Sequence, residues 1–119
     1  LNDKKTAFTT FSTLLELYPH SRYAKDAQLR MMYLRDLFAQ QELATAEYYY
    51  DSKAYVAAAN RATAVVEHYN KTPAVAQALV VLVKSYRQLN LDKQADNTLR
   101  ILQASYPDTP ELNALTHTT

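Results

Sequence analysis

The chain has 119 residues, enough for one small domain, and 48% of them are hydrophobic, so it can bury a modest core. Its formal net charge of +1 gives no electrostatic reason to expect nucleic-acid binding. The absence of cysteine excludes disulfides and thiolate chemistry, and the absence of glycine argues against phosphate-binding loops, dinucleotide fingerprints and nucleophile elbows.

Apolar residues recur at intervals of three and four along most of the chain, which is the period of an amphipathic α-helix. The prolines stand in turn contexts, where they end or begin such stripes. The sequence therefore predicts an all-α protein with helices at about 4–18, 22–51, 54–69, 73–89 and 92–106, followed by a polar tail over 108–119. We expect Thr72 to cap the fourth helix, with Pro73 in its first position.

The predicted helices are copies of one pattern. Three segments end alike, with Tyr, then Pro or Asn, then Ser or Thr two residues on: 18–21, 69–72 and 106–109. An alanine precedes each ending at the same distance, and in two of the three a tyrosine stands nine residues before that alanine. Helix–turn–helix units with this pattern are typical of the tetratricopeptide repeat. The expected structural signature residues are Ala7, Phe11, Pro19, Tyr49, Ala58, Tyr86, Ala95 and Pro107.

The repeats are unevenly spaced. Asn70 and Pro107 are 37 residues apart, near one repeat, whereas Pro19 and Asn70 are 51 apart. The excess is about four helical turns, and no breaker lies in the segment that would contain it. We therefore expect one helix of about 30 residues, projecting beyond a superhelix of antiparallel hairpins. It either spans the next groove or docks a partner.

This spacing divides a single repeat domain over 1–119 into parts. Residues 4–18 are the second helix of a truncated repeat, 22–69 a repeat with an extended first helix, and 73–107 the last repeat. Because the chain opens at Leu1 inside a predicted helix, we expect a fragment of a longer protein.

Two turns occupy equivalent places in successive hairpins. Lys53 and Asn90 stand where such repeats often use a glycine with positive φ. Asn tolerates that conformation and Lys does so poorly. We therefore expect the first turn to be tightened differently, by Asp51 or Ser52.

Candidate partner-binding residues lie in the middle of the chain. Bases dominate the first half of the long helix and acids, ending at Asp51, the second half, which opposes the helix dipole. In the run 48–50, Tyr49 takes the core position, so Tyr48 or Tyr50 is left for a groove or an interface. Asn60 and Arg61 interrupt an alanine-rich helix, where Arg61 either lies along its neighbours or pairs with a partner carboxylate.

The sequence offers no reaction chemistry. The histidines at 20, 68 and 117 have no second ligand at helical spacing, and no nucleophile–base pair can be assembled. We expect neither an enzyme nor a metal or cofactor site.

Several runs match one known family in combination: Tyr18-Pro19-x-Ser21-x-Tyr23-x-x-Asp26-Ala27, Leu34-Arg35-Asp36, Glu47-Tyr48-Tyr49-Tyr50, Ala54-Tyr55-Val56-Ala57, Asn60-Arg61, Tyr69-x-x-Thr72, Ala78-Leu79 and Tyr86-Arg87. Over about residues 7–107 the chain resembles the BamD family, also called YfiO or ComL. Lys53 departs from it, since the family usually has Gly there.

The resemblance implies a non-catalytic scaffold of the outer-membrane β-barrel assembly (BAM) complex. It implies the C-terminal half of a lipoprotein on the periplasmic face of the outer membrane, with its lipid anchor outside this sequence. The implied partners are the POTRA region of BamA, BamC and BamE, and the matched pair Asn60-Arg61 is implied to touch a partner. The alternative is another periplasmic tetratricopeptide adaptor of the CpoB type. An enzyme, or a binder of C-terminal peptide tails, is a weaker alternative.

Overall fold

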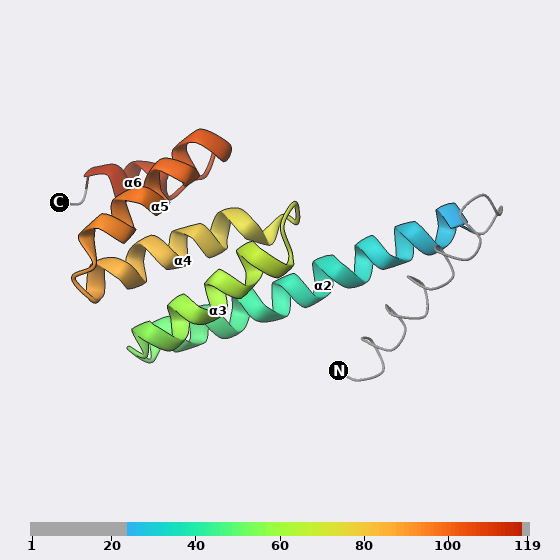
Figure 1. The fold of residues 1–119 in the computed structure, drawn as a ribbon, viewed down its shortest axis with the longest axis horizontal. Helices are drawn as coiled ribbons and strands as arrows, with labels where there is room; N and C mark the ends of the chain where they lie inside the picture. Colours follow the sequence, from blue (N-terminus) through green and yellow to red (C-terminus); the bar gives the residue numbers. More distant parts are fainter. Residues whose placement is uncertain (1–23, 118–119) are drawn as a thin grey trace. The chain divides into compact units, whose positions relative to one another are not determined.

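A computed structural model describes residues 24–117, and the side chains of 24–116. Within that range the chain is all-α, with α2 at Ala24–Asp51, α3 at Tyr55–His68, α4 at Ala74–Gln88, α5 at Asp92–Ser105 and α6 at Leu112–His117 (Figure 1). The predicted helix ends agree to within two residues wherever they are described. The predicted helix at 4–18, and the signature residues Ala7, Phe11 and Pro19, lie outside the described residues.

The long helix α2 has 28 residues, which confirms that the extra chain between the repeats is helical. The chain divides into two compact units, Leu1–Phe38 and Ala39–Thr119, and α2 contributes to both. In the first unit, one side of α2 buries Ala24 and Ala27, while Leu29, Met32 and Tyr33 are exposed. Projection of α2 beyond the stack stays a prediction. No helix within residues 24–117 has an apolar stretch long enough to cross a membrane.

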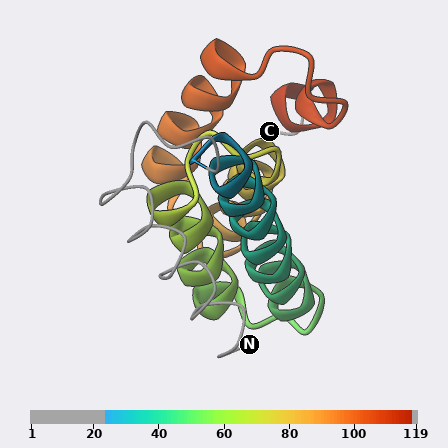
Figure 2. The ribbon, with the colours of Figure 1, turned by 90° about the vertical axis from the view of Figure 1, so that its right-hand side faces the viewer.

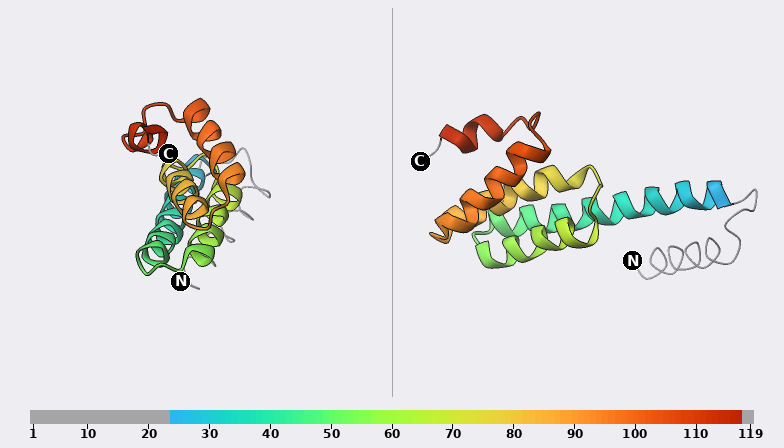
Figure 3. Two further views of the ribbon diagram at one scale, coloured as in Figure 1. Left: turned by 90° about the vertical axis from the view of Figure 1, so that its left-hand side faces the viewer. Right: turned by 45° about the horizontal axis from the view of Figure 1, so that its top comes forward.

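The second unit is a stack of helical hairpins. The end of α2 pairs with α3 through the turn at 52–54, and α4 pairs with α5 through the turn at 89–91, at the same end of the unit (Figure 1). The connection between the hairpins crosses at the opposite end (Figure 1). Helix α4 lies between the first hairpin and α5, while α3 and α5 lie on the same side of the stack (Figures 2 and 3). This is the tetratricopeptide-like arrangement that the sequence predicts.

The core of this unit forms around α4, which is apolar on most of its circumference, as expected for a helix with neighbours on several sides. The helices approach closely because small side chains stand at the crossings; Ala46, Ala58, Ala62 and Ala78 are all fully buried. Among the signature residues, Ala58 and Ala95 are buried, and Tyr49 and Tyr86 pack partly buried against the core.

The two hairpin turns are built identically. The N–H of Ala54 donates to the carbonyl of Tyr49 at 2.8 Å, and the N–H of Leu91 donates to the carbonyl of Tyr86 at 2.8 Å. Inner bonds from Lys53 to the Tyr50 carbonyl, and from Asn90 to that of Arg87, complete a Schellman motif in each turn.

The prediction that Lys53 would avoid positive φ was therefore wrong. Lys53 has φ 66° and Asn90 has φ 61°, so both residues adopt the left-handed conformation. The hydrogen bonds that end the helix require this conformation, and they outweigh the intrinsic cost of placing a lysine in it.

The second helix of each hairpin also ends in a repeated way. The N–H of Tyr69 donates to the Val65 carbonyl at 3.0 Å, and that of Tyr106 donates to the Leu102 carbonyl at 2.8 Å. Thr72 Oγ1 donates to the Tyr69 carbonyl at 2.7 Å, and a threonine at 109 makes the same 2.7 Å bond to the carbonyl at 106.

Two expectations need correction: one about the start of α4, and one about residues 108–119. Thr72 does not cap α4: the N-cap residue is Pro73, with no side-chain cap, and the Thr72 hydroxyl bonds to the preceding helix end. The stretch 108–119, expected to be a polar tail, contains the short helix α6. Leu115 of α6 is only 6% exposed and belongs to the core. The division of the chain into repeats stays a prediction.

We predict that Lys53→Gly stabilises the protein by about 0.5–1 kcal/mol. Glycine removes the cost of the left-handed conformation, and this gain exceeds the extra backbone entropy that glycine loses on folding. Urea unfolding followed by helical circular dichroism measures this. Asn90→Gly is the matched control, with a smaller gain because Asn tolerates positive φ. A loss of stability in Lys53→Gly would contradict the account of this turn.

Candidate protein-binding site

The seam between α2 and α3 brings together most of the candidate partner-binding residues. Ala46 on α2 and Ala58 and Ala62 on α3 are fully buried, so the two helices lie close together there. Successive positions on a helix are about 100° apart, so Asn60 and Arg61 point away from this core, and both are exposed. The packing of the alanines thus positions the polar pair at the outer edge of the hairpin.

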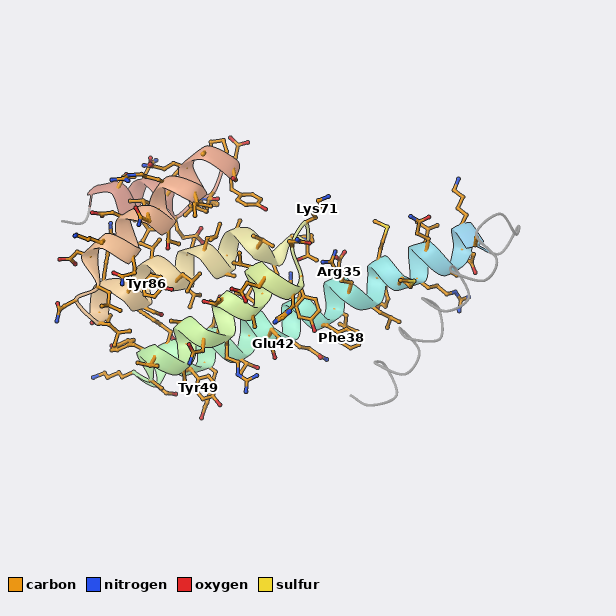
Figure 4. All side chains as sticks on the ribbon, in the orientation of Figure 1. Arg35, Phe38, Glu42, Tyr49, Lys71 and Tyr86 are labelled. Atoms are coloured by element: carbon orange, nitrogen blue, oxygen red, sulfur yellow. The ribbon has the colours of Figure 1, made fainter. Side chains whose placement is uncertain are left out.

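Arg61 pairs with a carboxylate of its own chain. Its Nη1 donates to Oε1 of Glu42 on α2 at 3.4 Å, and the two side chains are 49% and 27% exposed. Figure 4 shows Glu42 on the part of α2 that runs beside α3. The sequence interpretation considered packing along neighbours or a partner carboxylate, and it missed Glu42. Glu42 is about one helical turn farther from the hairpin turn than Arg61 is, so equal distance from the turn would not have identified the pair.

A cavity of about 470 Å³ opens beside this ion pair. It is lined by Tyr49 of α2 and by Ala57, Asn60, Arg61 and Ala64 of α3. The small apolar side chains of Ala57 and Ala64 therefore form part of its wall, and the ring of Tyr49 and the guanidinium of Arg61 form another part. Such a depression suits a protruding side chain of another protein better than a reaction that needs several converging polar groups.

The three consecutive tyrosines differ in exposure and in ring contacts. Tyr49 and Tyr50 are both partly buried against the core. Tyr48 is 61% exposed, and its ring centroid lies 5.8 Å from that of Tyr49, tilted by 52°. Tyr50 is partly buried against Tyr55, with ring centroids 5.3 Å apart in an edge-on arrangement. Tyr48 thus contacts a residue of the cavity lining without lining the cavity itself, and we call Glu42, Tyr48, Tyr49, Asn60 and Arg61 the α2–α3 surface.

Asp51 does not belong to the α2–α3 surface. It lines a separate cavity with Tyr50 of α2 and Lys84 of α4. Of the four predicted partner-binding residues, Asn60 and Arg61 line one cavity with Tyr49, Tyr48 contacts that tyrosine, and Asp51 lies elsewhere. Within residues 24–116, no group of three or more His, Cys, Asp or Glu side chains is placed to hold a metal ion.

The stack of hairpins defines a helical-repeat protein of the tetratricopeptide type. The cavity on its α2–α3 surface is suited to protein contacts. The family comparison is more specific. The chain belongs to the YfiO family, described as outer membrane lipoproteins, whose model matches residues 1–113.

Curated relatives are similar over most of this chain. It is 40% identical over 112 residues to the outer membrane protein assembly factor BamD of Xylella fastidiosa, covering 94% of this chain and 38% of the relative. Identity to BamD of Neisseria meningitidis is 36% over 108 residues, covering 91% and 40%, and to BamD of Pasteurella multocida 39% over 101 residues, covering 85% and 39%. The chain thus spans about two fifths of the length of these relatives.

We predict that the Arg61–Glu42 pair contributes less than about 1 kcal/mol to folding, because both side chains are partly solvated and only one contact is made. A double-mutant cycle of Glu42→Gln and Arg61→Gln, followed by urea unfolding, measures the coupling. A coupling well above that value would show the pair to be a structural clamp that cannot exchange partners.

Proposed function

We propose that this chain is part of a non-catalytic scaffold subunit of the BAM complex, and that its α2–α3 surface binds the POTRA region of BamA. BamC and BamE are further partners by resemblance. In this proposal the protein works at the periplasmic face of the outer membrane, held by a lipid anchor outside this sequence. The proposal draws support from the family match and from the name of the curated relatives, outer membrane protein assembly factor.

The main support for the proposal is that Arg61 can exchange its partner carboxylate, Glu42, for one on another protein. Its side chain is half exposed beside a cavity, and its bond to Glu42 is long at 3.4 Å. An exposed pair of this kind costs little to break, so a carboxylate on a docking domain can take over the guanidinium. A guanidinium that becomes desolvated in an interface then contributes more than it does in water.

The neighbours of Arg61 favour a protein partner. Asn60 offers an amide at the mouth of the same cavity, and Tyr48 presents an exposed aromatic ring beside Tyr49. Tyrosine and arginine are enriched at the energetically important positions of protein interfaces. The alanines of α3 leave room for a partner side chain to enter between these groups.

The alternatives have less support. An enzyme needs nucleophile, acid–base and charge-stabilising groups around one cavity, and this one has a single charged group among alanines, an amide and a phenol. A CpoB-like adaptor would share the repeat, but the family match and the Asn60-Arg61 pair favour the barrel-assembly scaffold.

We predict that Arg61→Glu weakens binding to the membrane-proximal POTRA domain of BamA by roughly tenfold or more, because attraction becomes repulsion at the contact. Isothermal titration calorimetry with the 119-residue chain at tens of micromolar measures this, and circular dichroism checks that helical content is intact. Arg100→Glu, a charge reversal at an exposed position of α5, is the matched control and keeps wild-type affinity. Equal affinities for Arg61→Glu and wild type would reject the role of Arg61, and no binding by the folded wild type would reject the contact itself.

A further inference from the structure

A second groove lies away from the α2–α3 surface, between the end of α2, α4 and the start of α6. Its main cavity has a volume of about 390 Å³. The floor is formed by Val80 and Val81 of α4, which are 4% and 5% exposed, and the rim is polar. We call this cavity and the second one described below the α4 groove.

The rim has an excess of negative charge on a protein whose net charge is +1. Glu47 and Asp51 of α2 and Glu111 before α6 supply three carboxylates, and Lys84 of α4 is the one cation in the lining. Lys84 Nζ lies 4.5 Å from the centroid of the Tyr50 ring, in a cation–π contact, and one cation stands against three carboxylates in the lining. Within the described part of the chain, neither Glu47 nor Asp51 forms an ion pair.

The end of α2 is electrostatically unfavourable without a partner. Glu47 and Asp51 are four positions apart, so two like charges lie on one face of the helix and repel each other. They also lie in or near the last turn, where the helix dipole disfavours acids, and that turn contains no basic residue. A cation bound in the α4 groove relieves both penalties, and this relief strengthens its binding.

A second cavity shares a lining residue with the main one. Gln77 of α4 borders the main cavity and also a second one of about 350 Å³, whose walls include Pro73, Tyr106 and Pro110. Gln77 Nε2 donates to Oε2 of Glu111 at 3.1 Å, which leaves the amide oxygen of Gln77 able to accept from a backbone N–H. Two cavities that share Gln77 as a lining residue offer neighbouring sites along an extended polypeptide.

We propose that the α4 groove binds an extended segment of a partner protein through an arginine side chain placed against Glu47 and Asp51. Arginine fits better than a metal ion, since no group of three metal-binding side chains is found among residues 24–116. It fits better than lysine, because a planar guanidinium can bond to two carboxylates with several N–H groups at once. Val80 and Val81 then contact the apolar part of the segment.

The probe is a short fluorescent peptide of serine, threonine and valine with one central arginine, compared with the same peptide carrying glutamate instead. Fluorescence anisotropy with the 119-residue chain should show saturable binding of the arginine peptide below about 1 mM, weakened by added salt, and no binding of the glutamate peptide. The double variant Glu47→Gln, Asp51→Asn should weaken binding roughly threefold to tenfold, as expected for two solvent-exposed charge pairs.

The matched control is Glu67→Gln with Asp92→Asn, which removes the same charge from exposed positions outside the groove lining and should leave the affinity unchanged. Arg61→Glu should also leave it unchanged, so this proposal and the BamA contact can fail separately. Absence of binding, equal affinity for both peptides, or equal loss in the control variant would overturn the proposal. Self-association that the Glu47→Gln, Asp51→Asn variant abolishes, with no peptide binding, would assign the groove to a second copy and also overturn it.

Discussion

The close approach of α2 and α3 at small side chains is the constraint on which the rest of the second unit depends. Ala46, Ala58 and Ala62 are completely buried, and larger residues there would push the helices apart. The same contact sets the separation across which Arg61 meets Glu42, and it leaves the space beside Tyr49 that forms the cavity. Packing inside the hairpin and the shape of its outer edge therefore have one structural cause.

The end of α2 presents two different surfaces because consecutive helical positions point in different directions. Tyr48 and Tyr49 lie at the α2–α3 surface, whereas Tyr50 and Asp51 line the α4 groove. A protein built of hairpins can thus use one helix for two contacts, with the core between them. The acidic end of α2, which opposes the helix dipole, belongs to the groove, while the guanidinium of Arg61 belongs to the outer surface.

The sequence predicted the parts of this fold that depend on local periodicity. The helix pattern, the buried alanines and the long α2 all follow from repeats of three and four and from the placement of breakers. It failed where tertiary context overrides local preference. Lys53 adopts positive φ because the Schellman hydrogen bonds require it. The Thr72 hydroxyl donates to a carbonyl at the end of α3 and does not cap α4. Helix α6 was missed because six residues are too few to show a period.

The candidate site was predicted in part. Asn60, Arg61 and Tyr48 were identified as candidates and do lie near one another, but Glu42 was found only when the hairpin placed it opposite Arg61. We propose that the membrane-proximal POTRA domain docks at the α2–α3 surface. The most direct test is to add that domain to the ¹⁵N-labelled chain and to follow the backbone amide resonances by NMR. We expect the largest changes to cluster at Glu42, Tyr48, Tyr49, Asn60 and Arg61. Changes confined to α4 and α6, with those residues unaffected, would contradict it.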